Sequence, residues 1–308
     1  MFKILFTIAI PVYNNENTIK DTIISCINQD YNNNYEILVV DNNSNDNTYE
    51  ILKELSDEIN IVRNLKTITM YENHNVCLKN AKGDYVLFCH ADDTLEKTAL
   101  LILEEKIKER NYPKKYVVWG RSKFRDYFNN WKKGQVELNN VLSGQFALDP
   151  FFYGGVTPSG TCYSKNSFLE LDGFINSNHK LSPSDMTTMI CLAYNGFEFE
   201  MIDRLYFNRE FASTAVDHSY NDMLNAVVDS MESLKKRMSE NEFEILIRRS
   251  FSLTNVPVLF ISTLIKMGYS KQKLLNYIIK KSIKNPKLFI KYILLTKYRY
   301  LIKLLFFE

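Results

Sequence analysis

Residues 81–93 read Ala-Lys-Gly-Asp-Tyr-Val-Leu-Phe-Cys-His-Ala-Asp-Asp, an apolar run that ends in two adjacent carboxylates. The continuous apolar segment Tyr85–Phe88 is typical of a parallel strand that is covered on both faces. Residues that follow such a strand lie at the carboxyl edge of an open sheet, where α/β folds bind their ligands. Asp92 and Asp93 are therefore the first candidates for a binding site.

Short apolar runs alternate with helical patterns over residues 1–120. Strands are predicted at residues 4–11, 35–41, 67–71, 84–90 and 115–120. Helices are predicted between them at residues 19–27, 51–55 and 94–110, and Thr94 is the expected cap of the last one. This alternation predicts an α/β fold with an open, Rossmann-like, mostly parallel sheet that is flanked by helices.

The pattern changes after the fifth predicted strand. Residues 121–165 carry aromatic and glycine residues without regular spacing, which predicts irregular connections with one or two short strands. A helix is expected at residues 184–195, a strand at residues 197–207, and helices from about residue 221 onward.

The composition is that of a globular protein, because 45% of the 308 residues are hydrophobic and 24% are charged. A formal net charge of +2 argues against a dedicated nucleic-acid-binding protein. The five cysteines are scattered without a CxxC spacing, which indicates reduced thiols in a cytosolic compartment and no zinc site. No segment reaches the roughly 18 to 20 apolar residues of a transmembrane helix, so we do not expect the chain to span a membrane.

Polar side chains follow three of the predicted strands. The first strand leads into Tyr13 and Asn14, the second ends at Asp41, and the fourth is followed by Asp92 and Asp93. Clustered carboxylates repel one another unless a cation or hydrogen-bond donors compensate their charge. Oxygen ligands favour Mg²⁺ or Mn²⁺ over zinc, so this edge of the sheet predicts a divalent-cation site.

Three segments together resemble the family 2 glycosyltransferases, which are inverting enzymes with the GT-A fold. They are residues 7–16 (Thr-Ile-Ala-Ile-Pro-Val-Tyr-Asn-Asn-Glu), residues 39–48 (Val-Val-Asp-Asn-Asn-Ser-Asn-Asp-Asn-Thr) and residues 81–93. The resemblance implies a glycosyltransferase domain over residues 1–215. Its half at residues 1–120 would bind the nucleotide, and its half at residues 121–215 would face the acceptor.

The resemblance also implies roles for individual residues. Tyr13 would stack on the nucleotide base, and Asp41 would accept a hydrogen bond from that base, which in this family is usually uracil. Asp92 would contact the ribose or the metal, and Asp93 would bind the Mn²⁺ or Mg²⁺ that bridges the diphosphate. The other residues expected at the nucleotide-sugar are Pro11, Asn14, Glu16, Asn43, Lys79 and Arg209.

Two positions depart from the family pattern. His90 stands where relatives usually have an acidic residue, and it is expected to be a packing or surface residue. Lys79 is the nearest equivalent of the arginine in an Arg-Asn pair that relatives carry. The general base that inverting transfer requires is assigned to Asp185, which follows a Gly-Phe turn at residues 173–174.

Simpler interpretations apply to the same residues. Asp92 and Asp93 could form a helix cap and turn, and Asp185 could only stabilise the first turn of its helix. Asp41 also suits a dinucleotide-binding fold, although the GxGxxG pattern does not follow the first strand. Arg209 could form a structural ion pair instead of a contact with the diphosphate.

The expected helical region at residues 216–308 becomes strongly basic toward its end. Between residues 266 and 308, eleven residues are Lys or Arg and only Glu308 is acidic. Interleaved Leu, Ile, Tyr and Phe residues make this pattern typical of amphipathic helices that lie on anionic membrane surfaces. A solvated helical cap or a homodimer interface is the alternative for this segment.

The sequence thus predicts an inverting glycosyltransferase that moves a sugar from a nucleotide-diphosphate donor, expected to be a UDP-sugar, to a glycan acceptor. A polyprenyl-diphosphate-linked acceptor would suit the basic C-terminal region, and O-antigen or capsule synthesis is the expected context. We expect the protein in the cytoplasm, at the inner face of the cell membrane, without a nucleic-acid partner. The alternatives are a nucleotidyltransferase and a catalytically silent assembly protein with the same fold.

Overall fold

The structure is a computed structural model that describes residues 5–122, 140–152, 156–177, 184–209, 219–251 and 258–284. The chain forms two compact units. Unit 1 comprises Met1–Asn176 and Ser184–Asp217, and unit 2 comprises Ser177–Pro183 and His218–Glu308. The domain boundary that we expected at residues 215 and 216 lies outside the described residues.

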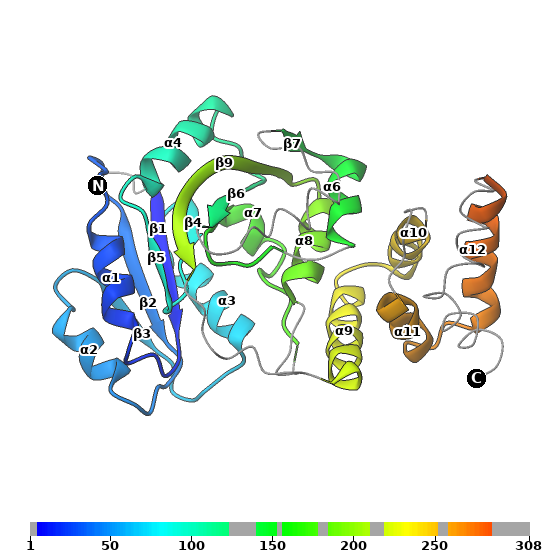
Figure 1. Cartoon of the computed structure of the whole chain (residues 1–308), viewed down its shortest axis with the longest axis horizontal. Coiled ribbons are helices and arrows are strands. Elements are labelled where there is room, and N and C mark those ends of the chain that lie inside the picture. Colours follow the sequence, from blue (N-terminus) through cyan, green and yellow to red (C-terminus); the bar gives the residue numbers. More distant parts are fainter. Residues whose placement is uncertain are drawn as a thin grey trace. The chain divides into compact units, whose positions relative to one another are not determined.

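Unit 1 is built on one sheet, in which the described residues form nine strands. The strands are β1 (Phe6–Val12), β2 (Glu36–Asp41), β3 (Asn60–Arg63), β4 (Tyr85–Phe88), β5 (Asp93–Leu95), β6 (Tyr116–Ser122), β7 (Val141–Leu142), β8 (Thr161–Ser164) and β9 (Glu198–Arg209). They follow the order β3-β2-β1-β4-β8-β6-β9-β5, and β7 pairs with β9 (Figure 1). Strands β3, β2, β1 and β4 are parallel, whereas β8 runs antiparallel to both of its neighbours. The predicted mostly parallel α/β sheet is therefore confirmed.

Helices flank this sheet and bury the apolar faces that the sequence pattern predicted (Figure 1). They are α1 (Ile19–Ile27), α2 (Thr48–Glu54), α3 (Met70–Asn80), α4 (Ala99–Glu109), α6 (Gly144–Phe151), α7 (Lys165–Leu169) and α8 (Ser184–Tyr194). Ile19 and Ile23 of α1 join Ile8, Val39 and Leu87 of the central strands in one buried apolar cluster. Burial of each such side chain contributes about 1.5–3 kcal/mol to the stability of the fold. The central parallel strands are mainly apolar because both of their faces are covered.

The prediction of a strand at residues 67–71 is wrong. The third strand is β3, at Asn60–Arg63, and helix α3 begins at Met70. Thr69 caps this helix. Its side chain accepts a hydrogen bond from the Glu72 backbone, and the Glu72 carboxylate accepts one from the Thr69 backbone in return. The Thr-x-x-Glu spacing is the capping-box signature, and it outweighs the β propensity of the short run that contains Ile68.

The helix predicted at residues 94–110 begins later than expected. Asp93–Leu95 forms strand β5, which pairs antiparallel with β9, and Ala99 is the first residue of α4. Thr94 is therefore part of a strand rather than a helix cap. The buried Leu95 lies opposite Phe207 in this pairing and belongs to the apolar core, which explains why the segment is extended.

Unit 2 is helical in its described residues, as predicted from residue 221 onward. Its helices are α9 (Tyr220–Lys235), α10 (Glu240–Ser250), α11 (Val258–Lys266) and α12 (Lys271–Lys284). Glu244 of α10 accepts hydrogen bonds from Lys273, Tyr269 and Tyr277, so α12 and the turn before it are fastened to α10. Among the described helices, none has the length and apolar character that crossing a membrane requires.

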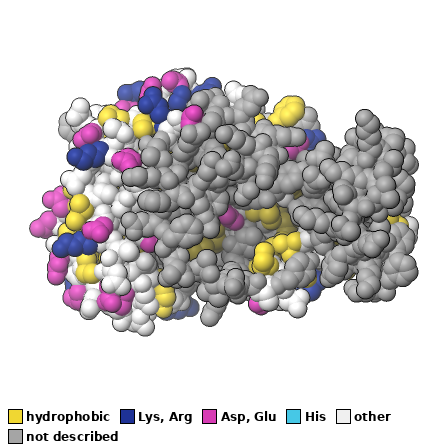
Figure 2. All heavy atoms as spheres, viewed as in Figure 1, with side chains coloured by type: hydrophobic (Ala, Val, Ile, Leu, Met, Phe, Trp, Pro, Cys, Tyr) yellow, Lys and Arg dark blue, Asp and Glu magenta, His cyan; other side chains and the backbone are white. Residues whose placement is uncertain are grey.

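Charged side chains of both signs are interspersed over the outer part of unit 1, where helices α1, α2 and α4 lie (Figure 2). Two of the pairs on α4 are Lys106 with Glu109 and Lys108 with Glu104. Exposed pairs of this kind contribute little to stability, at most about 1 kcal/mol each. The mixture agrees with the nearly balanced charge of the sequence.

Candidate active site

The parallel strands β1, β2 and β4 end at one edge of the sheet. Val12 of β1 pairs with Asp41 of β2, and Ala9 of β1 pairs with Phe88 of β4. The polar segments that follow these strands therefore leave the sheet side by side. This edge carries the residues that the sequence analysis proposed for ligand binding.

The loops after β1 and β2 are bound to each other by side chains. The backbone N–H of Asn14 donates to Ser44 Oγ at 3.0 Å, and the backbone N–H of Asn45 donates to Asn14 Oδ1 at 2.9 Å. Asn14 and Asn43 both adopt positive φ angles, 52° and 61°, a region in which Asn is favoured among non-glycine residues. These predicted residues thus shape the rim of the site through their backbone.

Glu16 and Asp46 extend the same connection. The Glu16 backbone donates to Asp46 Oδ2 at 3.2 Å, and the Asn47 backbone donates to Glu16 Oε2 at 2.9 Å. Partial burial acts to raise the pKa of Asp46. The hydrogen bonds from Thr48 and from the Glu16 backbone together outweigh this effect and lower the pKa. Glu16 therefore has a clear structural task in joining the two loops, and its predicted contact with the nucleotide-sugar stays a prediction.

Asp41 is 0% exposed and lies between a backbone donor and an arginine. The Ser44 N–H donates to Asp41 Oδ1 at 3.1 Å, and Arg63 Nε lies 3.1 Å from Asp41 Oδ2 in an ion pair. Arg63 also donates to the Ser44 carbonyl at 3.0 Å, and its guanidinium lies 4.0 Å from the centroid of the Tyr49 ring. The buried Asp41 carboxylate is thus held in one orientation at the end of β2.

Arg63 was not among the predicted site residues. The residue ends β3, the third parallel strand, and therefore reaches the same edge as Asp41. A basic residue at the end of a correctly placed third strand would have been the signal. Placing that strand at residues 67–71 concealed it.

Tyr13 directly follows β1 at this edge and is 45% exposed. Pro11 is the partly buried penultimate residue of β1. An exposed ring beside a buried carboxylate can stack on a planar base while the carboxylate accepts a hydrogen bond from that base. The arrangement of Tyr13 and Asp41 is compatible with the roles that we expected.

His90, Asp92 and Asp93 form a compact cluster after β4. One possible ligand atom from each of the three side chains lies within 4.8 Å of the others. Asp93 is 1% exposed and accepts a hydrogen bond from Ser159 Oγ, whereas Asp92 and His90 are partly exposed. The two adjacent aspartates therefore differ in their exposure to solvent.

Ser159 and Gly160 fix the backbone beneath this cluster. The His90 N–H donates to Ser159 Oγ at 3.0 Å, and the Gly160 N–H donates to the Phe88 carbonyl at 2.8 Å. Gly160 has a φ of 75°, and a Cβ at this position would collide with the Phe207 ring. Only glycine fits this turn, which brings Ser159 to the end of β4 from a distant part of the chain.

His74 packs behind the cluster, where its Nε2 lies 3.1 Å from His90 Nε2. It is 1% exposed and stacks on Phe88 with 5.3 Å between the ring centroids. Burial lowers the pKa of His74 to about 4. This ring is therefore neutral near pH 7, and the sequence analysis gave no reason to connect it with His90.

The cluster fits a divalent cation. Two carboxylates and an imidazole offer three ligand atoms in one place, and Mg²⁺ and Mn²⁺ bind carboxylate oxygens. A cation would also compensate the mutual repulsion of the adjacent Asp92 and Asp93. The ligand pair that we predicted, Asp92 and Asp93, is thus chemically suitable, and the imidazole of His90 lies close to it.

The other predicted residues lie in different places. Lys79 is exposed in the last turn of α3, close to the start of β4, so the structure does not bring it to the cluster beyond the far end of that strand. Asp185 lies in the first turn of α8, where its carboxylate accepts a hydrogen bond from the Met186 N–H at 2.7 Å. Arg209 is the last residue of β9, and its backbone pairs with Asp93.

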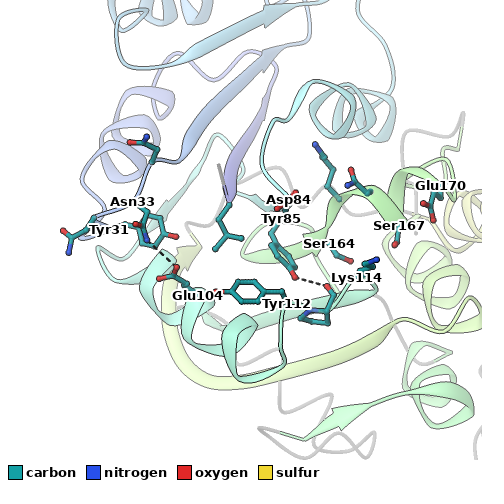
Figure 3. A pocket seen from close by; sticks show the side chains of 16 residues that line it. Tyr31, Asn33, Asp84, Tyr85, Glu104, Tyr112, Lys114, Ser164, Ser167 and Glu170 are labelled. Carbon is teal, nitrogen blue, oxygen red and sulfur yellow. Dashed lines mark hydrogen bonds between the residues drawn. The ribbon is translucent and has the colours of Figure 1, made fainter. Parts of the chain in front are cut away.

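Unit 1 also contains a hollow of about 1000 Å³ at the opposite edge of the sheet (Figure 3). Tyr31, Glu104 and Tyr112 line it together with Tyr85, the first residue of β4. Ligands of open α/β sheets bind beyond the carboxyl ends of the strands. This hollow lies at the amino end of β4 and is therefore not assigned to the nucleotide-sugar.

Comparison with known proteins gives the family. Residues 7–168, more than half of the chain, match the family described as Glycosyl transferase family 2. An uncharacterized glycosyltransferase of Haemophilus influenzae is 25% identical over 223 residues, which make up 67% of this chain and 89% of that protein. Poly(ribitol-phosphate) beta-N-acetylglucosaminyltransferase TarS of Staphylococcus aureus is 34% identical over 99 residues, which make up 31% of this chain but only 17% of TarS.

Two solved structures share the fold. The crystal structure of S. aureus TarS in complex with UDP-GlcNAc has a TM-score of 0.57 at 20% identity, covering 81% of this chain and 73% of that chain. The mannosyltransferase PcManGT from Pyrobaculum calidifontis in complex with GDP-Man and Mn²⁺ has a TM-score of 0.58 at 14% identity, covering 99% and 85%. The GT-A fold is therefore confirmed, and the family match over more than half of the sequence shows that this chain belongs to glycosyltransferase family 2.

Proposed function

We propose that this glycosyltransferase takes a sugar from a UDP-sugar and transfers it to a glycan acceptor with inversion at the anomeric carbon. The observation that carries the proposal is the line of groups at one sheet edge: the exposed Tyr13 ring, the fixed Asp41 carboxylate and the cluster that contains Asp92. The base would lie against Tyr13 and Asp41, and the ribose and the diphosphate would lie toward the cluster that contains Asp92. TarS, which shares the fold, was solved with UDP-GlcNAc, and this supports the choice of nucleotide.

The chain's own residues would divide the work as follows. Tyr13 stacks on the uracil ring, and Asp41 accepts a hydrogen bond from its N–H. Asp92, together with Asp93, would hold Mn²⁺ or Mg²⁺, and a bound cation supplies positive charge that stabilises the departing diphosphate. PcManGT, which shares the fold, was solved with Mn²⁺ and supports this part of the proposal.

The transfer step needs a base on the acceptor side. We assign it to Asp185, whose carboxylate would take the proton of the acceptor hydroxyl while that oxygen attacks the anomeric carbon. The bond between the anomeric carbon and the diphosphate oxygen breaks on the opposite face, and the bond electrons leave with UDP. Asp185 stands in the first turn of α8, where the helix dipole favours the ionised carboxylate that a base requires.

The acceptor is proposed to be a glycan on a polyprenyl diphosphate, used for a surface polysaccharide such as O-antigen or capsule. Helix α12 (Lys271–Lys284) supports it, because its sequence contains five lysines, no acidic residue and several Leu, Ile and Tyr residues. Such a helix binds anionic lipid headgroups and would bring the enzyme to a lipid-linked substrate at the inner face of the cell membrane. Sedimentation with vesicles of phosphatidylglycerol tests it. Absence of binding at low salt would contradict the membrane part alone.

The decisive experiment is a screen of nucleotide-sugars with a lipid-linked acceptor mimic, in which UDP release and the mass of the product are measured. A sugar added to the acceptor with release of UDP supports the proposal. Pyrophosphate release from a nucleoside triphosphate and a sugar phosphate would instead indicate a nucleotidyltransferase. Calorimetric binding of UDP and Mn²⁺ without any transfer or slow donor hydrolysis would indicate a silent assembly protein.

A further inference from the structure

We propose that His90 binds the metal through Nδ1, and that His74 holds the His90 ring in the tautomer that makes this possible. The site would then have one nitrogen ligand beside its carboxylates, and it would prefer Mn²⁺ to Mg²⁺. This inference rests on the proposed metal-dependent site. It adds a ligand and a positioning residue to that site.

His74 is oriented by the Met70 carbonyl. His74 Nδ1 lies 2.8 Å from this oxygen, which can only accept a hydrogen bond. Nδ1 of His74 must therefore carry a hydrogen. The His74 ring is 1% exposed and packed against Phe88, Phe174 and Tyr71, and such an apolar environment favours the neutral imidazole. A neutral ring with a hydrogen on Nδ1 has a lone pair on Nε2.

His74 in turn determines which ring nitrogen of His90 carries a hydrogen. The Nε2 atoms of the two rings are 3.1 Å apart, and the rings are nearly perpendicular at 85°. Since His74 Nε2 is the acceptor, His90 Nε2 must be the donor. A neutral His90 with its hydrogen on Nε2 carries its other lone pair on Nδ1. The chain of hydrogen bonds from Met70 thus selects the nitrogen that His90 can offer to a metal.

His90 is held in place next to Asp92 and Asp93. Its backbone is fixed on both sides, because its N–H donates to Ser159 Oγ at 3.0 Å and its carbonyl accepts from the Asp93 N–H at 3.0 Å. The side chain belongs to the group of three whose ligand atoms lie within 4.8 Å of one another. It is partly exposed, as is Asp92.

The chemistry of the ligands gives the metal preference. Metal-binding histidines usually donate their second ring N–H to a fixed acceptor, and loss of that acceptor typically weakens metal binding about 10–100-fold. His74 is such an acceptor for His90. Mg²⁺ strongly prefers oxygen ligands, whereas Mn²⁺ accepts an imidazole nitrogen more readily. A His90 ligand would therefore shift the site toward Mn²⁺.

The test is pulsed electron paramagnetic resonance of Mn²⁺ bound to the full chain, with and without UDP. The wild-type protein should show the modulation of a directly coordinated histidine ¹⁴N, which changes to the ¹⁵N pattern when histidine is isotope-labelled. His90→Asp, which replaces the imidazole by a carboxylate, should lose this nitrogen signal and still bind Mn²⁺. The same variant should lower the ratio of Mn²⁺ to Mg²⁺ affinity at least tenfold.

Two variants of His74 separate positioning from packing. His74→Phe keeps a ring in the apolar pocket but removes the acceptor, and Mn²⁺ affinity should fall about 10–100-fold. His74→Gln offers an amide oxygen to His90 and should recover a large part of that affinity. Circular dichroism melts test whether each variant is folded. If His74→Phe does not fold, His90→Asp alone tests the ligand assignment.

The outcomes distinguish this inference from the proposed function. Mn²⁺ binding without a coordinated nitrogen overturns the inference and leaves a metal-dependent transferase intact. Failure to bind Mn²⁺ even with UDP overturns the inference and the metal role together. A nitrogen signal in a protein that transfers no sugar from any nucleotide-sugar supports the inference and contradicts the proposed function.

Discussion

Replacement of Arg63 by methionine tests the architecture that fixes the Asp41 carboxylate. The ion pair joins Arg63 Nε and Asp41 Oδ2 at 3.1 Å, and Asp41 is completely buried. Arg63→Met keeps an unbranched side chain that can still lie on the Tyr49 ring, but it removes the charge and the hydrogen bond to the Ser44 carbonyl. The buried carboxylate then keeps the Ser44 N–H as its hydrogen-bond donor.

The free energy of unfolding should fall by about 2 kcal/mol. Removal of one partner from a fully buried pair costs about 3–5 kcal/mol, but the Arg63 side chain is 36% exposed, so solvent already screens part of the interaction. The hydrogen bond that Ser44 retains lowers the cost further. For a unit of roughly 200 residues, about 2 kcal/mol lowers the melting temperature by about 4–8 °C.

Differential scanning calorimetry of Arg63→Met, Asp41→Asn and the double variant measures the coupling between the two side chains. We expect about 1–2 kcal/mol of coupling energy. Titration with UDP should show affinity about tenfold weaker for Arg63→Met, because the Asp41 carboxylate loses its fixed orientation. Lys53→Met is the matched control, since Lys53 also lies over the Tyr49 ring but forms its ion pair with the exposed Glu50. A melting temperature within about 1 °C of the wild type for Arg63→Met, together with coupling near zero, would refute the reasoning.

Three further substitutions test the remaining assignments. Asp93→Ala should abolish metal-dependent turnover, measured as UDP release with and without Mn²⁺; a folded variant that keeps its activity would remove Asp93 from the metal site. Asp185→Asn should leave calorimetric UDP binding unchanged and remove transfer, and loss of UDP binding would move Asp185 out of the base role. Thr69→Ala should lower stability by about 1 kcal/mol in urea denaturation because it deletes the cap of α3, while UDP affinity stays the same; an unchanged midpoint would show that the cap contributes nothing.

The sequence was sufficient to predict the parts of the site that follow long, strongly apolar strands. Strands β1, β2 and β4 are buried throughout or nearly so, and their apolar runs have no other good interpretation. Their ends therefore located Tyr13, Asp41 and the Asp92-Asp93 pair correctly at one edge. Parallel strand order then brings these residues together without any further information.

The errors arose where short segments have balanced preferences. Strand β3 covers only Asn60–Arg63 and is partly exposed, so its sequence carries almost no period-2 signal. Strand β5 covers only Asp93–Leu95 and exists because β9 pairs with it. Tertiary pairing decided both segments, and the misplaced third strand is the direct reason why Arg63 escaped notice.

Residues that reach the site from distant segments could not be predicted from the sequence either. They form hydrogen bonds with the side chains of the site. Ser159 donates to Asp93 across 66 positions of the chain, and His74 meets His90 across 16 positions. Neither belongs to a local motif, since a serine before a glycine and a histidine inside a helix are common. Each acts on a neighbour by hydrogen bonding, so its identity matters through geometry that only the folded sheet supplies. The sequence presents the departure at His90 as the loss of a carboxylate; in our proposal it is the gain of a nitrogen ligand, because His74 lies behind it.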